Sequence, residues 1–182
     1  GKSFSISDLG LEFTNVLVSD GITGNSIVLD KKQSKELYNQ LKNKEFIKEG
    51  SSKEHTGWSY SLTFFNVDHE IENIYILDPD TIGYDGYFYK MKESDLDMEG
   101  FAALFKTTFQ GTVIEKGQSL LVAPDKNSNE AKSSDQIVVR TNNAMIIDEN
   151  KQKINIESIE IGDVVEITYN GIIMESYPAQ IS

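Results

Sequence analysis

The chain has 182 residues, of which 38% are hydrophobic and none is cysteine, and its formal net charge at pH 7 is -12. This length can form one large or two small hydrophobic cores, while the lack of thiols excludes disulfides, thiolate catalysis and zinc sites with cysteine ligands. Because the surface is acidic, we expect no nucleic-acid partner, and membrane contact only through a lipid anchor absent from this chain.

Four segments of the first half have the composition of β-strands. In the clearest of them, 58–65, every second side chain is large and apolar, as in a strand with one buried face. These side chains are Trp58, Tyr60, Leu62 and Phe64. The predicted strands are 11–18, 26–29, 58–65 and 71–77. Between the second and third of them, residues 48–57 are rich in Gly, Ser and charged residues and predict a loop.

Two helices are predicted in the same half. Asp30 and Gln33 have the spacing of a capping box, so we expect a helix to begin there and to end near Lys44. A second helix is predicted after Ser94, an N-cap residue that is followed by apolar side chains at helical spacing. These side chains are Met98, Phe101, Ala102 and Phe105.

The stretch TIGYDGYFYKM, residues 81–91, predicts a hairpin around the pair Asp85-Gly86. Asp-Gly favours a two-residue type I′ turn, in which both residues have positive φ. Opposed residues then share a face of the sheet, and we expect Phe88 to lie over Gly83, where no side chain competes. The expected pairs are Tyr84 with Tyr87, Gly83 with Phe88, and Ile82 with Tyr89.

The tyrosines of this hairpin have two interpretations. An aromatic face on a hairpin usually packs in a core, and we favour that interpretation; the alternative is an exposed platform for a ligand. A second candidate surface is a groove between the two domains near Phe101 and Phe105. The binding residues of these two hypotheses are Tyr84, Asp85, Tyr87, Tyr89, Phe101 and Phe105.

The second half is rich in short predicted strands separated by turns. We place the domain boundary so that residues 1–106 form the first domain and 107–182 the second. The Asn170-Gly171 pair predicts another tight hairpin. The predicted strands are 109–115, 119–123, 137–141, 164–169 and 172–176, with 144–147 as a further strand or an extension of the third. The predicted fold is therefore α+β: a β-meander with helices, followed by a small closed β-barrel of the OB type.

The C-terminal sequence resembles the YobA-like domain of Gram-positive bacteria. The resemblance is carried by IGDVVEI at 161–167, YNG at 169–171 and ESYPAQI at 175–181. Residues 58–65 and 84–90 resemble a second short domain of similar lipoproteins. Both families are uncharacterised. The resemblance implies an extracellular protein, lipid-anchored to the cell membrane, whose signal and lipobox cysteine lie outside this sequence; it implies no catalytic or binding residue.

The sequence contains no strong catalytic or metal-binding motif. The two histidines, His55 and His69, lie in predicted loops without metal-ligand spacing and are interpreted as solvated. The oxygen-bearing residues that begin at Asp125 are spaced like the start of a calcium loop, but Glu130 replaces the required glycine and Gln136 the bidentate glutamate. We expect no cofactor and no metal site.

The specific function cannot be deduced from these residues. The favoured hypothesis is a non-enzymatic binding or interaction module of a cell-envelope lipoprotein, with an envelope protein or a small ligand as its partner. One alternative is a hydrolase that acts on envelope polymers through carboxylates. The other is a carrier of small ligands or cations that uses acidic loops.

Overall fold

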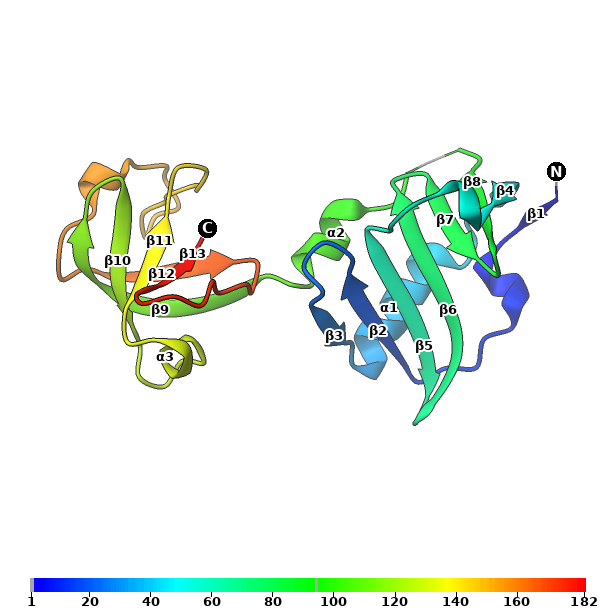
Figure 1. Cartoon of the computed structure of the whole chain (residues 1–182), viewed down its shortest axis with the longest axis horizontal. Coiled ribbons are helices and arrows are strands. Elements are labelled where there is room, and N and C mark those ends of the chain that lie inside the picture. Colours follow the sequence, from blue (N-terminus) through cyan, green and yellow to red (C-terminus); the bar gives the residue numbers. More distant parts are fainter. Residues whose placement is uncertain (1, 94) are drawn as a thin grey trace. The chain divides into compact units, whose positions relative to one another are not determined.

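The computed structural model describes residues 2–93 and 95–182. The chain divides into two compact units, Gly1–Leu104 and Phe105–Ser182, whereas the predicted boundary follows residue 106. Both units consist mainly of β-sheet, and the described residues contain three short α-helices, so the α+β class is confirmed (Figure 1). No helix in the described part of the chain is both long and apolar enough to cross a membrane.

An eight-stranded antiparallel sheet forms the first unit, with the strand order β1-β4-β8-β7-β6-β5-β2-β3. Helix α1, Lys31–Leu41, lies against one face of this sheet (Figure 1). Two further short helices, η1 (Ile6–Leu9) and η2 (Ser52–Glu54), are of the 3-10 type. The strands are β1 Ser3–Phe4, β2 Asn15–Asp20, β3 Ser26–Val28, β4 Phe46–Ser51, β5 Tyr60–Asn66, β6 His69–Asp78, β7 Thr81–Tyr84 and β8 Tyr87–Met91.

The core of the first unit lies between α1 and the sheet. Cross-strand pairing places Val18, Leu62 and Ile74 in one row, and all three side chains are fully buried. The predicted alternation in the strand at 58–65 is therefore confirmed for Leu62 and Phe64, which is also fully buried. Removing side chains of this size from water is the main favourable contribution to folding.

The predicted start of the loop at 48–57 is wrong. Residues 48–51 belong to β4, Phe46–Ser51, because β4 pairs with β8 across a bulge near Gly50. Such pairing depends on a distant strand, so local composition gave no sign of it. The predicted N-cap Ser94 lies outside the described residues; α2, Met98–Ala103, begins after Asp97, whose Oδ1 accepts a hydrogen bond of 2.9 Å from the Gly100 N–H.

A five-stranded sheet forms the second unit, with the order β12-β9-β10-β11-β13. All neighbours are antiparallel except β11 and β13, which are parallel. Helix α3, Glu130–Ser133, lies between β10 and β11 in the sequence, and the 3-10 helix η3, Ile156–Ser158, precedes β12. The strands are β9 Thr107–Lys116, β10 Ser119–Pro124, β11 Ile137–Arg140, β12 Val164–Tyr169 and β13 Ala179–Ile181.

The predicted closed barrel is not confirmed. Within the described residues β12 does not pair with β13, so the sheet keeps two ends. The expected strand at 172–176 contributes only an isolated bridge from Met174 to Gln180. A type I′ hairpin at Asn170-Gly171 would need positive φ at both residues; Gly171 has a φ of 82°, and Asn170 is not among the described residues with positive φ.

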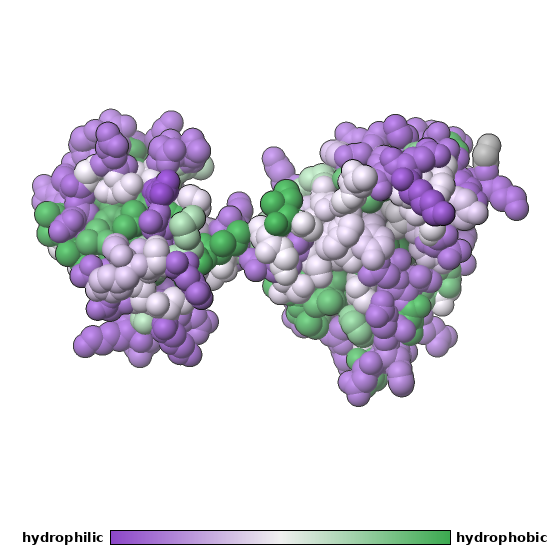
Figure 2. All heavy atoms as spheres, viewed as in Figure 1, coloured by the Kyte–Doolittle hydropathy of each residue, from purple (hydrophilic) through white to green (hydrophobic). Residues whose placement is uncertain are grey.

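The inward side chains of this second sheet form their own hydrophobic core, which includes Phe109, Val122 and Ile137. Leu121 and Val138 face each other across β10 and β11 on the opposite side of the sheet and are half-buried. Figure 2 shows an apolar patch over these two strands, whereas the visible face of the first unit is largely neutral to hydrophilic.

Candidate functional site

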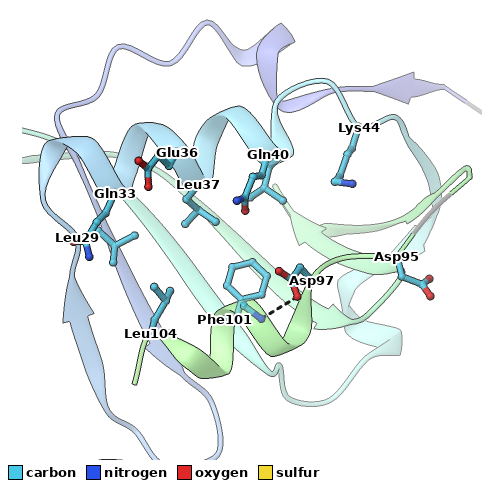
Figure 3. Close-up of a pocket in the computed structure, with 12 residues that line it drawn as sticks. Leu29, Gln33, Glu36, Leu37, Gln40, Lys44, Asp95, Asp97, Phe101 and Leu104 are labelled. Carbon is cyan, nitrogen blue, oxygen red and sulfur yellow. Dashed lines mark hydrogen bonds between the residues drawn. The ribbon is translucent and has the colours of Figure 1, made fainter. Parts of the chain in front are cut away.

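A groove between α1 and α2 in the first unit has a volume of about 480 Å³. Its walls carry five apolar side chains, from Leu29, Leu37, Leu41, Phe101 and Leu104. Figure 3 shows Leu37 pointing into the groove from α1, and Phe101 and Leu104 on the opposite wall. The groove is therefore an apolar trough whose lining comes entirely from the first unit.

Helix α1 supplies one wall because its lining residues recur every three or four positions. Residues at this spacing lie on one side of an α-helix. Asp30 fixes the start of the helix: its Oδ1 accepts from the Gln33 N–H at 2.7 Å, and the Gln33 Oε1 accepts from the Asp30 N–H at 3.0 Å. The predicted capping box is thus confirmed, although the helix ends at Leu41 and not near Lys44.

Helix α2 supplies the opposite wall and is anchored by Phe101. This side chain is only 3% exposed, and its ring stacks on Tyr60 with centroids 5.2 Å apart. Gly100 allows the tight first turn, because a Cβ there would overlap the carboxylate of Asp97 that caps the helix. Burial, and then the charge of Asp20, raise the pKa of Tyr60, the ring on which Phe101 stacks.

The rim of the groove is polar and carries more negative than positive charge. Its charged lining residues are Glu36, Asp95 and Asp97 against Lys44, and two glutamines complete the rim. In Figure 3, Lys44 and Asp95 lie at the end of the groove that is remote from Leu29 and Leu104. Glu36 lies nearer Leu29, so the charged residues are spread along the rim around an apolar interior, a distribution that suits a ligand with both characters.

The hairpin at 81–91 forms as predicted. Asp85 and Gly86 have φ values of 48° and 81°, which are those of a type I′ turn. All three predicted pairs are found: Tyr84 with Tyr87, Gly83 with Phe88, and Ile82 with Tyr89.

The hairpin tyrosines have different surroundings. Tyr84 and Tyr89 pack on Phe4, with ring centroids 5.5 Å and 4.6 Å away. Tyr87 is 41% exposed, but its ring is covered by the Lys48 ammonium, which lies 3.3 Å from the centroid. Asp85 is exposed. All three tyrosines thus have a partner within the unit. The hypothesis that the hairpin is a binding platform stays a prediction, and it centres on Tyr87 and Asp85.

Tyr84 also donates a hydrogen bond of 3.2 Å from its hydroxyl to Glu72 Oε2. Desolvation by burial raises the pKa of Tyr84 to about 12, and the charge and hydrogen bond of Glu72 add to the rise. This tyrosine cannot act as an acid or base near neutral pH, and we interpret it as a link between β7 and β6.

The expectation that Phe88 lies over Gly83 is wrong. The ring lies over Gly50 of the next strand, where an added Cβ would be 2.7 Å from a ring atom, and the His55 ring packs against it with centroids 4.3 Å apart. A Cβ at Gly83 would instead meet Tyr75 and Leu77. The glycine of β4 accommodates Phe88, and His55, predicted to be solvated, is half-buried against that ring.

The two predicted phenylalanines fall in different units. Phe101 lies in the α1–α2 groove, whereas Phe105 begins the second unit, where its carbonyl accepts a hydrogen bond of 3.4 Å from the Thr107 hydroxyl. Sequence reasoning missed the α1 wall of the groove. The amphipathic pattern of α1 could have indicated this wall, but nothing in the sequence indicated that α2 would lie beside α1.

The second unit contains a buried carboxylate that was also missed. Glu130 is 4% exposed, and its Oε2 accepts a hydrogen bond of 2.7 Å from the hydroxyl of Tyr169, which is 7% exposed. Burial, and then the hydrogen bond to Glu130, raise the pKa of Tyr169. The pair joins α3 to the end of β12.

The loop at 125–129, where the sequence resembles the start of a calcium loop, forms its own turn. The side chain of Asp125 accepts from the Asn127 N–H at 2.9 Å, and its carbonyl accepts from the Ser128 hydroxyl at 2.6 Å. Among residues 2–93 and 95–182, no group of three or more His, Cys, Asp or Glu side chains is arranged to hold a metal ion.

Comparison with known proteins gives one result, and it concerns the second unit. Residues 110–182 match a family described as a protein of unknown function, DUF3221. No curated protein and no solved structure matches the chain. The YobA-like identity and the lipid anchor stay predictions. The C-terminal residues 110–182 therefore form a DUF3221 domain of unknown function.

Proposed function

We propose that this protein is a non-enzymatic binding module at the outer side of a cell membrane, and that its α1–α2 groove binds an apolar side chain of a peptide or protein partner. The main observation in support of this proposal is the size of the α1–α2 groove. Its volume of about 480 Å³ lies within the range of roughly 300–1,000 Å³ that is typical of ligand sites. The extracellular, lipid-anchored location is supported only by the resemblance of the C-terminal sequence to secreted and lipid-anchored proteins.

The charged rim favours a basic neighbour beside the apolar anchor. Glu36 and Asp95 are exposed and free to face such a group, whereas Asp97 already caps α2. Complementary charge at a rim mainly selects the partner and speeds association, while the apolar floor contributes most of the affinity. The preferred ligand is a peptide in which a leucine-like side chain follows a lysine or arginine.

The groove supports binding better than hydrolysis. Acid catalysts of hydrolases are tuned by apolar surroundings, whereas the groove carboxylates of Glu36, Asp95 and Asp97 are all exposed. Glu130 is buried but belongs to the other unit, where it is engaged by Tyr169.

The test is an NMR titration of the ¹⁵N-labelled chain with acetyl-Lys-Leu-Leu-amide. We expect amide shifts to concentrate on α1 and α2, and acetyl-Lys-Ser-Ser-amide to cause none. The variant Leu37→Glu places a charge in the groove and should abolish the shifts. Asn39→Glu is the matched control, since it adds the same charge on an exposed position of α1 outside the groove. Shifts away from the groove, or equal binding by both variants, would refute the proposal.

We also propose that the second unit is an open, OB-like sheet. This assignment is supported by the strand order β12-β9-β10-β11-β13 with one parallel pair, β11 and β13. A partly open five-stranded Greek-key barrel has this kind of arrangement. An experimental structure of the chain would test it: the proposal fails if β11 and β13 are not neighbours.

A further inference from the structure

Strand β12 is the exposed end of the second sheet and pairs only with β9. Just before it, the Val113 N–H donates to the Asp163 carbonyl at 2.9 Å, so the backbone of Asp163 faces β9. Backbone groups of successive strand residues point to alternate sides. The backbone N–H and C=O groups of Val165, Ile167 and Tyr169 therefore face β9 as well. The backbone groups of the residues between them point away from β9.

The hydrogen bonds between β9 and β10 indicate the same alternation of backbone directions. The Gln110 carbonyl accepts from the Asp125 N–H at 2.8 Å, on the side of β10, so Gln110 faces away from β12. Its neighbours Gly111 and Phe109, which oppose Val165 and Ile167, face β12. Among the described residues, no backbone group of β12 bonds outside the β9 ladder. Its outward N–H and C=O groups belong to Val164, Glu166 and Thr168.

This edge lacks the features that protect other edges of the molecule. Natural edge strands are kept very short, or carry proline, a charged side chain (most often lysine) or a bulge, and of these devices β12 has only the single charge of Glu166. In the first unit the edge strands β1 and β3 have two and three residues. In the second unit β13 is bridged by Met174. Strand β12 has six residues, VVEITY, with no proline, no lysine and no register shift against β9.

The side chains along β12 also show that an added strand would bury apolar surface. Val165 and Ile167 pack against the core but stay half-buried, while Val122 and Ile137 on inner strands are fully buried. On the other face, Val164 is 68% exposed. A strand placed beside β12 would cover both faces of this edge, because opposed residues share a face and lie in contact.

The acidic residues along β12 indicate what kind of strand could pair with it. Glu166 is the only charged residue of β12, and the segment before it contributes Glu160 and Asp163, all exposed. A second copy of this chain would bring the same acidic edge and a further net charge of -12. A strand with a basic residue opposite Glu166 would instead meet the opposite charge, which stabilises cross-strand pairs.

We propose that β12 is a strand-addition site for an extended segment of a protein partner, with a basic side chain opposite Glu166 and apolar side chains opposite Val165 and Ile167. Main-chain hydrogen bonds to the outward groups of β12 hold the segment, and the alternate side chains give it specificity. This site does not depend on the α1–α2 groove, which lies in the other unit.

The experiment is an NMR titration of the whole labelled chain with acetyl-Thr-Val-Lys-Val-Lys-Val-Thr-amide. We expect shifts along β12, and slower hydrogen exchange of the Val164, Glu166 and Thr168 amides. The matched peptide with glutamate at both lysine positions should bind about ten-fold more weakly. In Glu166→Gln the difference between the two peptides should shrink, while the lysine peptide still binds.

Two variants test the role of the backbone. Thr168→Pro removes an outward N–H without removing a bond to β9 and should abolish binding. Thr168→Val, which loses only the 2.9 Å hydroxyl contact with Thr108, should bind normally. Because Thr168→Pro could also unfold the strand, Val164→Pro at the first strand position serves as the second blocking variant, with circular dichroism to verify folding.

The outcomes separate the possible occupants. Absence of shifts on β12 with the lysine peptide, or unchanged binding in both folded proline variants, overturns the proposal. Sedimentation of the chain alone is expected to show a monomer. A dimer that Thr168→Pro abolishes would assign the edge to a second copy of the chain and would also overturn the proposal.

Discussion

Replacing Tyr169 by phenylalanine should destabilise the second unit selectively. The hydroxyl is the hydrogen-bond donor to the buried carboxyl group of Glu130, at 2.7 Å. The phenylalanine ring can keep the edge-to-face contact with Phe109, whose centroid lies 5.7 Å away. The substitution therefore isolates the loss of one hydrogen bond from the loss of packing.

The expected loss in the free energy of unfolding is about 2 kcal/mol, since a buried polar group left without its hydrogen-bond partner costs about 1–3 kcal/mol. Removing one partner of a buried polar pair is costly because the other stays desolvated. For a domain of 60–100 residues, such a loss lowers the melting temperature by roughly 8–16 °C. Glu130→Gln keeps an acceptor for the Tyr169 hydroxyl and should cost less.

The assay is urea unfolding followed by two signals. Far-UV circular dichroism reports on both sheets, while the fluorescence of Trp58, the single tryptophan, reports on the first unit. We expect the dichroism transition of the second unit to move to lower urea in Tyr169→Phe and the Trp58 transition to stay in place. A loss below about 0.5 kcal/mol, within the range of an exposed substitution, would refute the reasoning.

The pH dependence provides a second check. Burial and the Glu130 hydrogen bond raise the pKa of Tyr169 in the folded state above its unfolded value of about 10. Stability from a raised pKa is fully present below the unfolded pKa and is lost as pH rises through the folded one. The difference between the wild type and Tyr169→Phe should therefore be constant from neutral pH to about pH 10 and shrink above it.

Three further substitutions have defined outcomes. Tyr84→Phe should remove a tyrosinate signal that appears near pH 12 in an ultraviolet titration, and leave the amplitude gained by pH 10 unchanged. Asp30→Ala should lower the free energy of unfolding by about 1 kcal/mol in urea titrations through loss of the N-cap, and an equal effect from Asn39→Ala would contradict this cause. Gly50→Ala should cost about 1–3 kcal/mol in the same assay, because its Cβ would meet the Phe88 ring. Gly117→Ala, with open space around it, is the control and should cost far less.

The sequence alone determined those features that depend on neighbouring residues. The Asp85-Gly86 turn and its register follow from the positive φ that this dipeptide accepts. The capping box of Asp30 and Gln33 involves residues three positions apart, so its partners are fixed by the sequence itself. The burial of Leu62 and Phe64 follows from the period of a strand.

Only the tertiary structure decided which distant segments meet. Strand β4 exists because β8 lies beside it, and Gly50 receives the ring of Phe88 that local reasoning placed over Gly83. The α1–α2 groove, the Glu130–Tyr169 pair and the open edge of β12 all join or separate residues far apart in the chain. Local φ and ψ preferences carry no information about such contacts, because their free energy arises only when the two segments are packed together.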